Sequence, residues 1–132
     1  MRVLALDYGR ARCGCAISDP TGTVARPLPA LEPAEPRAAA ELAREHEAEL
    51  VVVGMPIGLD GKEGAQAAET RGFVSEVERF AEVPVETWDE RFTTKLAERS
   101  AREGATGVED SLAAAHLLES WLAAHPAGEE KS

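Results

Sequence analysis

Two short and almost wholly apolar runs most strongly constrain how this chain folds. They occupy residues 3–6 (VLAL) and 50–53 (LVVV). Apolar runs of this length, without polar alternation, are typical of strands that are buried on both faces of a sheet. A helical pattern that begins at Pro36 precedes the second run. Because crossovers of this kind are right-handed, we expect the two runs to be parallel strands of one sheet.

Turn residues and periodicity predict the remaining elements. Turns at 9–11 and 20–22 separate strands at 12–19 and 23–31, and such short links indicate an antiparallel meander. Pro27 and Pro29 place the 23–31 strand at a sheet edge. Further along we expect a glycine-rich loop at 54–64, a helix at 65–82, a strand at 83–88, and helices at 93–103 and 110–124. The predicted fold class is α/β: a mixed five-stranded sheet in the order β-β-β-α-β-α-β-α-α, with helices on both faces.

The length and composition bound the class of protein. A chain of 132 residues suits one domain, which we expect at 1–125, followed by a polar and disordered tail at 126–132. No stretch approaches the roughly 20 apolar residues of a membrane span, and no basic-plus-apolar leader is present, so we expect a soluble cytoplasmic protein. A metal site at Cys13 and Cys15 needs two more ligands, and no histidine has a matching spacing. We therefore interpret both cysteines as small core residues in a reducing compartment.

Three carboxylates follow or open elements that are directed toward one edge of the predicted sheet: Asp7, Glu90 and Asp110. Asp7 shares a strand face with apolar residues, although an aspartate that begins a turn is an alternative. Asp110 lies on the same side of its helix as Trp121, although a first-turn acid favoured by the helix dipole is an alternative. Glu90 alone reads equally well as an ordinary charged loop residue. Clustered carboxylates repel one another, and Mg²⁺ or Mn²⁺ is the usual remedy.

Positive charge is scarce but locally concentrated. The net charge of −10 argues against broad wrapping of nucleic acid. A basic stripe on the 93–103 helix suits backbone contacts, although a solvated face paired with glutamates is an equal alternative; it comprises Arg91, Lys95, Arg99 and Arg102. Lys62 could reach a phosphate from the glycine-rich loop, which lacks the ending of a P-loop. His46 is interpreted as a residue at a helix C-terminus rather than as a ligand.

Four segments, in order along nearly the whole chain, carry a resemblance to a known family. They are residues 7–19 (DYGRARCGCAISD), 53–64 (VGMPIGLDGKEG), 89–94 (DERFTT) and 110–114 (DSLAA). Together they resemble the motifs of the YqgF/RuvX family, whose members are described as Holliday junction resolvases and as pre-16S rRNA nucleases. One departure is Ala11, which stands where the family often has lysine.

The resemblance implies an RNase H-like fold and a hydrolase that acts on phosphodiester bonds. It implies that Asp7, Glu90 and Asp110 are the catalytic residues and the metal ligands, with Mg²⁺ or Mn²⁺ as cofactor. It also implies a part in ribosome biogenesis, namely processing of the 5′ end of pre-16S rRNA. We also expect phosphate contacts from Arg12, Lys62, Arg91 and Lys95.

The expected partner is nucleic acid, with a ribosomal RNA precursor or the small-subunit precursor favoured over a DNA junction. No membrane partner is expected, and the chain is expected to be a monomer or a weak homodimer. A junction resolvase needs a two-fold dimer, and no long apolar stripe indicates one, whereas processing of a single RNA strand makes no such demand. Two alternatives remain besides junction resolution in DNA repair. One is a non-catalytic RNA- or protein-binding module on the same fold. The other is an actin-like phosphotransferase, which needs two such domains.

Overall fold

The computed structural model describes residues 1–57, 61–92 and 111–126 of the chain. Its five strands form one sheet in the order β3-β2-β1-β4-β5. The strands are β1 (Val3–Tyr8), β2 (Cys13–Ser18), β3 (Ala25–Leu31), β4 (Leu50–Met55) and β5 (Val85–Asp89). The helices are α1 (Pro36–Glu45), α2 (Ala65–Phe80), the 3₁₀ turn η1 (Glu90–Phe92) and α4 (Leu112–Ala124).

The strand pairing confirms the predicted mixed sheet. Strand β1 lies at the centre, antiparallel to β2 and parallel to β4. Strand β3 continues the antiparallel meander at one edge, where Pro27 and Pro29 are tolerated, and β5 extends the parallel part at the other edge. The carboxyl ends of β1, β4 and β5 therefore meet at the same edge of the sheet, which is where ligands bind in open α/β sheets.

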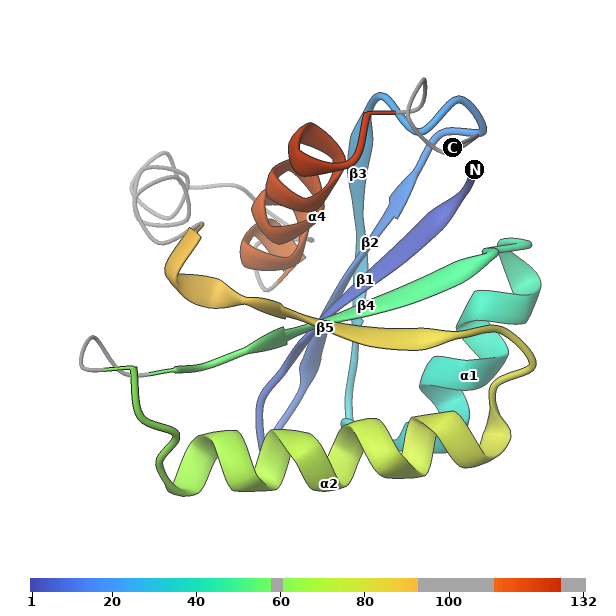
Figure 1. Ribbon diagram of the computed structural model, residues 1–132. Helices are drawn as coiled ribbons and strands as arrows, with labels where there is room; N and C mark the ends of the chain where they lie inside the picture. Colours follow the sequence, from blue (N-terminus) through green and yellow to red (C-terminus); the bar gives the residue numbers. More distant parts are fainter. Residues whose placement is uncertain (58–60, 93–110, 127–132) are drawn as a thin grey trace.

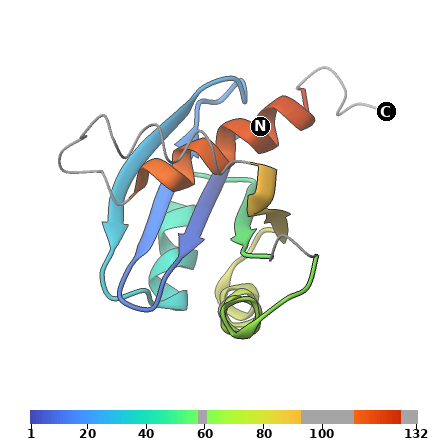
Figure 2. The ribbon, with the colours of Figure 1, turned by 90° about the vertical axis from the view of Figure 1, so that its left-hand side faces the viewer.

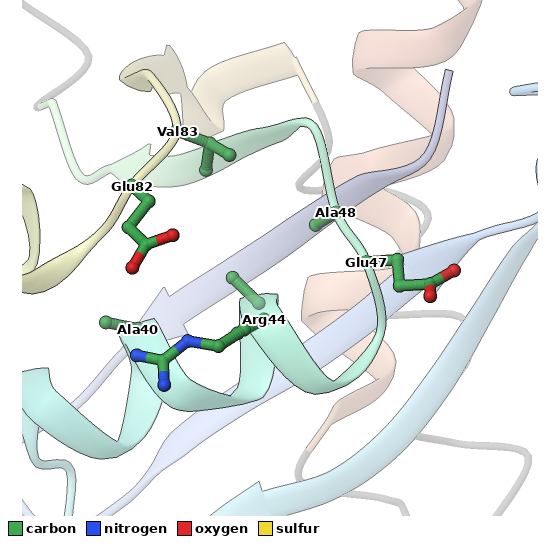
Figure 3. A pocket seen from close by; sticks show the side chains of 7 residues that line it. Ala40, Arg44, Glu47, Ala48, Glu82 and Val83 are labelled. Atoms are coloured by element: carbon green, nitrogen blue, oxygen red, sulfur yellow. The ribbon is translucent and has the colours of Figure 1, made fainter.

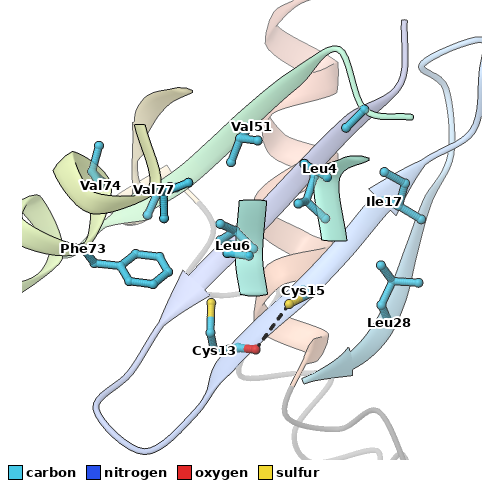
Figure 4. Packing of buried hydrophobic residues seen from close by; sticks show 14 residues of the cluster. Leu4, Leu6, Cys13, Cys15, Ile17, Leu28, Val51, Phe73, Val74 and Val77 are labelled. Atoms are coloured by element: carbon cyan, nitrogen blue, oxygen red, sulfur yellow. Dashed lines mark hydrogen bonds between the residues drawn. The ribbon is translucent and has the colours of Figure 1, made fainter. Parts of the chain in front are cut away.

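Helices cover both faces of the sheet, as predicted (Figures 1 and 2). Because side chains alternate along a strand, Leu4 and Leu6 of β1 pack toward α1 and α2, whereas Val3 and Ala5 pack toward α4. The α1/α2 cluster includes Phe73 (Figure 4). The Phe73 ring stacks on that of Tyr8 with 4.5 Å between ring centroids. The two layers give β1 its completely buried run.

Both cysteines are core residues, which confirms their interpretation. Cys13 and Cys15 are free thiols that are buried among the residues of the α1/α2 layer. The thiol of Cys15 donates to the backbone carbonyl of Cys13 at 3.4 Å (Figure 4). His46 likewise lies at the C-cap of α1, as expected.

Element boundaries differ slightly from the predicted ones. Strand β5 begins at Val85 rather than at 83, because Pro84 has no amide hydrogen for the ladder and contributes only its carbonyl, which accepts from Val51 N at 3.0 Å. Helix α2 ends at Phe80 rather than at 82, and α4 begins at Leu112 rather than at 110. The predicted helix at 93–103 and most of the predicted tail, 127–132, lie outside the described residues. In the described part of the chain, the helices are too short or too polar to cross a bilayer.

The start of α4 is fixed to the sheet by one buried serine. Ser111 is the N-cap residue of α4 and has no exposed surface. Its Oγ accepts a hydrogen bond from the backbone amide of Cys15 at 2.9 Å. The register between β2 and β3 shifts between Cys13 and Cys15, so this hydroxyl bonds an amide beside an irregular part of the ladder.

We predict that Ser111→Ala lowers the free energy of unfolding by about 1–3 kcal/mol, because the amide of Cys15 is then buried without a partner. Chemical denaturation followed by circular dichroism measures this change. The matched control is Ser75→Ala on the exposed face of α2, which removes a hydroxyl from a helix that favours alanine. Equal stability of both variants contradicts the anchoring role of Ser111.

Candidate active site

Asp7 lies on the α4 face of the sheet, where glycines leave room for its carboxylate. It follows Val3 and Ala5 on alternate positions of β1, and both of those pack toward α4. The partner of Asp7 across the β1–β2 ladder is Gly14. On the other side of β1, strand β4 ends in Gly54 and Met55. Asp7 is therefore the first polar side chain on an otherwise apolar face of β1. The residues beside it on the adjacent strands, Gly14 and Gly54, have no side chains.

Glu90 reaches the same place from the end of β5. It opens the 3₁₀ turn η1, directly after Asp89, whose carboxylate accepts from the amide of Arg91 at 2.9 Å. The Glu90 side chain lies directly on Gly54. A Cβ atom at position 54 would lie 2.8 Å from Glu90 Oε2 and 2.9 Å from Glu90 Cγ. Both distances are shorter than van der Waals contact allows. Gly54 thus provides the space that Glu90 occupies.

Asp7 and Glu90 share a proton. Burial raises the pKa of Glu90 to about 8, with further contributions from the negative charge of Asp7 and from the hydrogen bond that Glu90 donates to it. Burial also raises the pKa of Asp7, against the opposing effect of the same hydrogen bond. Two carboxylates that are this close in a partly buried site cannot both stay ionised unless a cation compensates them. The donor set therefore suits a hard divalent cation in place of the proton.

The third predicted ligand, Asp110, lies outside the described residues, as does Lys95. Among the residues that the structure describes, no three histidine, cysteine or acidic side chains are grouped closely enough to hold a metal ion. The residue after Asp110 is Ser111, which bonds the amide next to Gly14, the partner of Asp7. The role of all three acids as ligands stays a prediction.

Three of the predicted phosphate contacts, Arg12, Lys62 and Arg91, lie within the described residues. Arg91 lies near the glycine-rich loop, because a Cβ at Gly61 would be 3.9 Å from its Nη1, and Lys62 is the next residue in the sequence. Arg91 also pairs with Asp89 at 2.6 Å. Arg12 begins the β2 side of the first hairpin, where its Nη2 lies 3.6 Å from Glu32 Oε2.

The sequence pattern alone did not identify the two glycines that lie beside the carboxylates of Asp7 and Glu90. The sequence predicts Gly54 only as part of the glycine-rich loop, whereas the structure places the Glu90 side chain against it. Gly14 gave no signal, because its partnership with Asp7 depends on the register of the hairpin. Arg10, in the turn after β1, was also missed; its side chain pairs with Glu69 of α2.

A separate hollow of about 180 Å³ lies at the opposite edge of the sheet, before β4 and β5 begin (Figure 3). Its floor is formed by small side chains such as Ala43 and Ala48, with Arg44 and Glu82 among the residues that line it. It holds none of the predicted site residues. The predicted site residues Asp7 and Glu90 lie instead at the carboxyl ends of β1 and β5.

We predict that Gly54→Ala separates Glu90 from Asp7, because the new methyl group takes the position of the Glu90 side chain. The pKa of Glu90 then falls from about 8 toward the ordinary value of a glutamate. Carboxyl-carbon NMR titration measures both values. Gly72→Ala is the control, because a Cβ at Gly72 meets nothing within 4 Å. An unchanged Glu90 titration in Gly54→Ala contradicts this packing.

The same pair predicts how stability depends on pH. The folded pKa of Glu90, about 8, is above the value for an unfolded chain, so the folded state binds more protons between those values. The metal-free protein should therefore lose stability as the pH rises from about 5 to about 8. Glu90→Gln should flatten this dependence, which thermal unfolding at several pH values tests. A profile as steep as that of the wild type argues against the shared proton.

Comparisons with known proteins agree on the family. The sequence profile described as "RuvX: Holliday junction resolvase" matches residues 1–124. A protein of an Anaeromyxobacter species is 42% identical over 132 residues, covering 92% of this chain and 96% of the relative. A protein of Halothermothrix orenii is 36% identical and covers 92% and 94%. Both relatives bear the name "Putative pre-16S rRNA nuclease".

Solved structures agree on the fold. RuvC of T. thermophilus in complex with a Holliday junction superposes with a TM-score of 0.61 at 16% identity, covering 95% of this chain and 96% of that chain. The Holliday junction resolvase of fowlpox virus superposes with a TM-score of 0.56 at 12% identity, covering 94% and 99%. At these identities the likeness concerns the fold alone, and it confirms the predicted RuvC-type, RNase H-like architecture. With the profile match and the identities to its relatives, the chain belongs to the RuvX/YqgF family.

Proposed function

We propose that this protein is a divalent-metal-dependent nuclease that hydrolyses phosphodiester bonds in the 5′ region of pre-16S rRNA. The observation that carries the proposal is the meeting of Asp7 and Glu90 at the carboxyl edge of β1 and β5, over Gly54. The names of the relatives, over nearly the whole length of both chains, support the substrate.

Asp7 and Glu90 are the proposed first ligands, and Asp110 is proposed to complete the set. When bound, Mg²⁺ or Mn²⁺ activates a water molecule and neutralises charge on the phosphate. The central strand β1 holds Asp7, and the Glu90 side chain packs against Gly54. Both carboxylates are therefore oriented before a cation binds. Ser111, the residue after Asp110 in the sequence, ties the start of α4 to β2 beside Gly14.

The cationic side chains near this edge suit the substrate backbone. Arg91 lies near Gly61, the residue before Lys62, and Arg12 lies in the turn of the first hairpin, directly before β2. Contacts from these residues position nucleic acid without reading its sequence. We also propose that the protein acts in the cytoplasm, as a monomer or a weak dimer.

Junction resolution is the second candidate, because the matching profile is described by that activity. It requires two active sites related by a two-fold axis. The choice between the two functions is therefore a choice between substrates and between oligomeric states, and one experiment addresses both.

We predict that the purified protein with Mn²⁺ or Mg²⁺ cleaves a labelled pre-16S rRNA fragment in preference to a four-way DNA junction. Asp7→Asn should reduce cleavage by at least about a hundredfold, because it removes a charge that the metal needs. Mn²⁺ should raise the melting temperature of the wild type and not that of Asp7→Asn.

The Asp7→Asn variant should remain folded without metal, because it relieves the repulsion between the two acids. Cleavage of the junction alone selects the second candidate. Metal-independent RNA binding with no cleavage of either substrate selects the non-catalytic module. Undiminished cleavage by Asp7→Asn rules out the proposed site.

A further inference from the structure

Arginines near the carboxyl edge of the sheet are each held by an acidic side chain. Arg10 pairs with Glu69 at 2.9 Å, Arg12 with Glu32 at 3.6 Å and Arg91 with Asp89 at 2.6 Å. Arg71 of α2 pairs with Glu63. These four arginines of the described residues are thus already paired with carboxylates of the same chain, in a protein whose net charge is −10.

The Arg10–Glu69 pair is the most open of these. Nε of Arg10 donates to both carboxylate oxygens of Glu69, at 3.1 and 2.9 Å. The Arg10 side chain is 81% exposed, and that of Glu69 is 38% exposed. An ion pair this exposed is weak, because water and salt screen it. A phosphate, which suits the arginine fork as well as a carboxylate does, can therefore displace Glu69.

The pair borders a hollow between the first hairpin and the start of α2. Tyr8, Gly9, Ala65 and Gln66 line this hollow of about 310 Å³ together with Arg10 and Glu69. Arg10 is only three residues after Asp7, so their Cα atoms are within about 11 Å of each other. The Asp7 side chain faces α4, whereas the hollow lies on the α2 side of the sheet. A substrate strand that passes Asp7 and continues around the end of β1 therefore brings a further phosphate toward Arg10.

We propose that Arg10 contacts a backbone phosphate of the substrate strand in this hollow, and that Glu69 competes with that phosphate and limits the affinity. This inference rests on the proposed nuclease function, because it needs a nucleic-acid substrate at this edge. Glu69 is then an intramolecular competitor that holds Arg10 in place and lowers affinity. A purely structural ion pair predicts the opposite, namely that loss of Glu69 leaves Arg10 disordered and binding unchanged or weaker.

The test is binding of a labelled single-stranded rRNA precursor fragment without divalent ions, so that no cleavage occurs. Glu69→Gln should bind about two- to fivefold more tightly than the wild type, which is the equilibrium factor that corresponds to an exposed ion pair. The matched control is Glu76→Gln at the other end of α2, which breaks a similar exposed pair with Arg79, 3.3 Å apart, and changes the net charge equally. It should bind with a smaller gain than Glu69→Gln.

Arg10→Ala shows whether the effect acts through Arg10. This variant should bind more weakly than the wild type, and adding Glu69→Gln to it should restore less than the gain seen in the wild-type background. Glu69→Gln should also steepen the dependence of affinity on salt, since one more cation then releases counterions from the RNA. All variants change exposed side chains, and melting temperatures verify that they are folded.

The outcomes separate this inference from the proposed function. Wild-type binding without tighter binding by Glu69→Gln overturns the inference and leaves the nuclease proposal intact. An equal gain in Glu69→Gln and Glu76→Gln also overturns it, because the effect is then one of net charge. Failure of every variant to bind RNA overturns the proposed function and this inference with it.

Discussion

The repulsion between two partly buried carboxylates is the interaction on which the proposed chemistry depends. Asp7 lies on β1 and Glu90 directly follows β5, and β4 separates these two strands. The two acids meet because Gly54, the residue before the last of β4, has no side chain. Burial raises the pKa of both groups, and the charge of Asp7 raises that of Glu90 further, so without a cation Glu90 keeps its proton and donates it to Asp7 in a hydrogen bond. Such an arrangement costs stability by itself. It is therefore best understood as a site that is arranged in advance for a cation.

The rest of the fold holds these two side chains in place. The buried run of β1 fixes the backbone of Asp7 between two helical layers, and the parallel pairing of β4 with β5 aligns Trp88 with Gly54, two residues before Glu90. On the α4 face, Ser120 accepts a hydrogen bond from Trp88 Nε1 at 3.0 Å, which joins α4 to the same strand. Closely packed cores leave few alternative positions for the side chains at their edges.

Charge explains how an acidic protein can act on an acidic polymer. Ion pairs such as Arg10 with Glu69 hold cations at the edge of the sheet, yet they are exposed and exchange easily with phosphate. Affinity is then modest and depends on salt. A processing enzyme that must release its product benefits from such weak contacts, whereas broad wrapping of RNA requires an excess of positive charge, and the net charge of this chain is −10.

The sequence by itself determined the layers of this protein and the identity of its acids. The unalternated runs at 3–6 and 50–53 required a central parallel pair, the prolines placed β3 at an edge, and the four motifs identified the family. Only the tertiary structure decided which atoms meet. The contact of Glu90 with Gly54, the facing of Asp7 by Gly14 and the pairing of Arg10 with Glu69 depend on strand register and on side-chain direction. Local sequence patterns encode periodicity and turns, whereas register is set by the packing of the whole sheet.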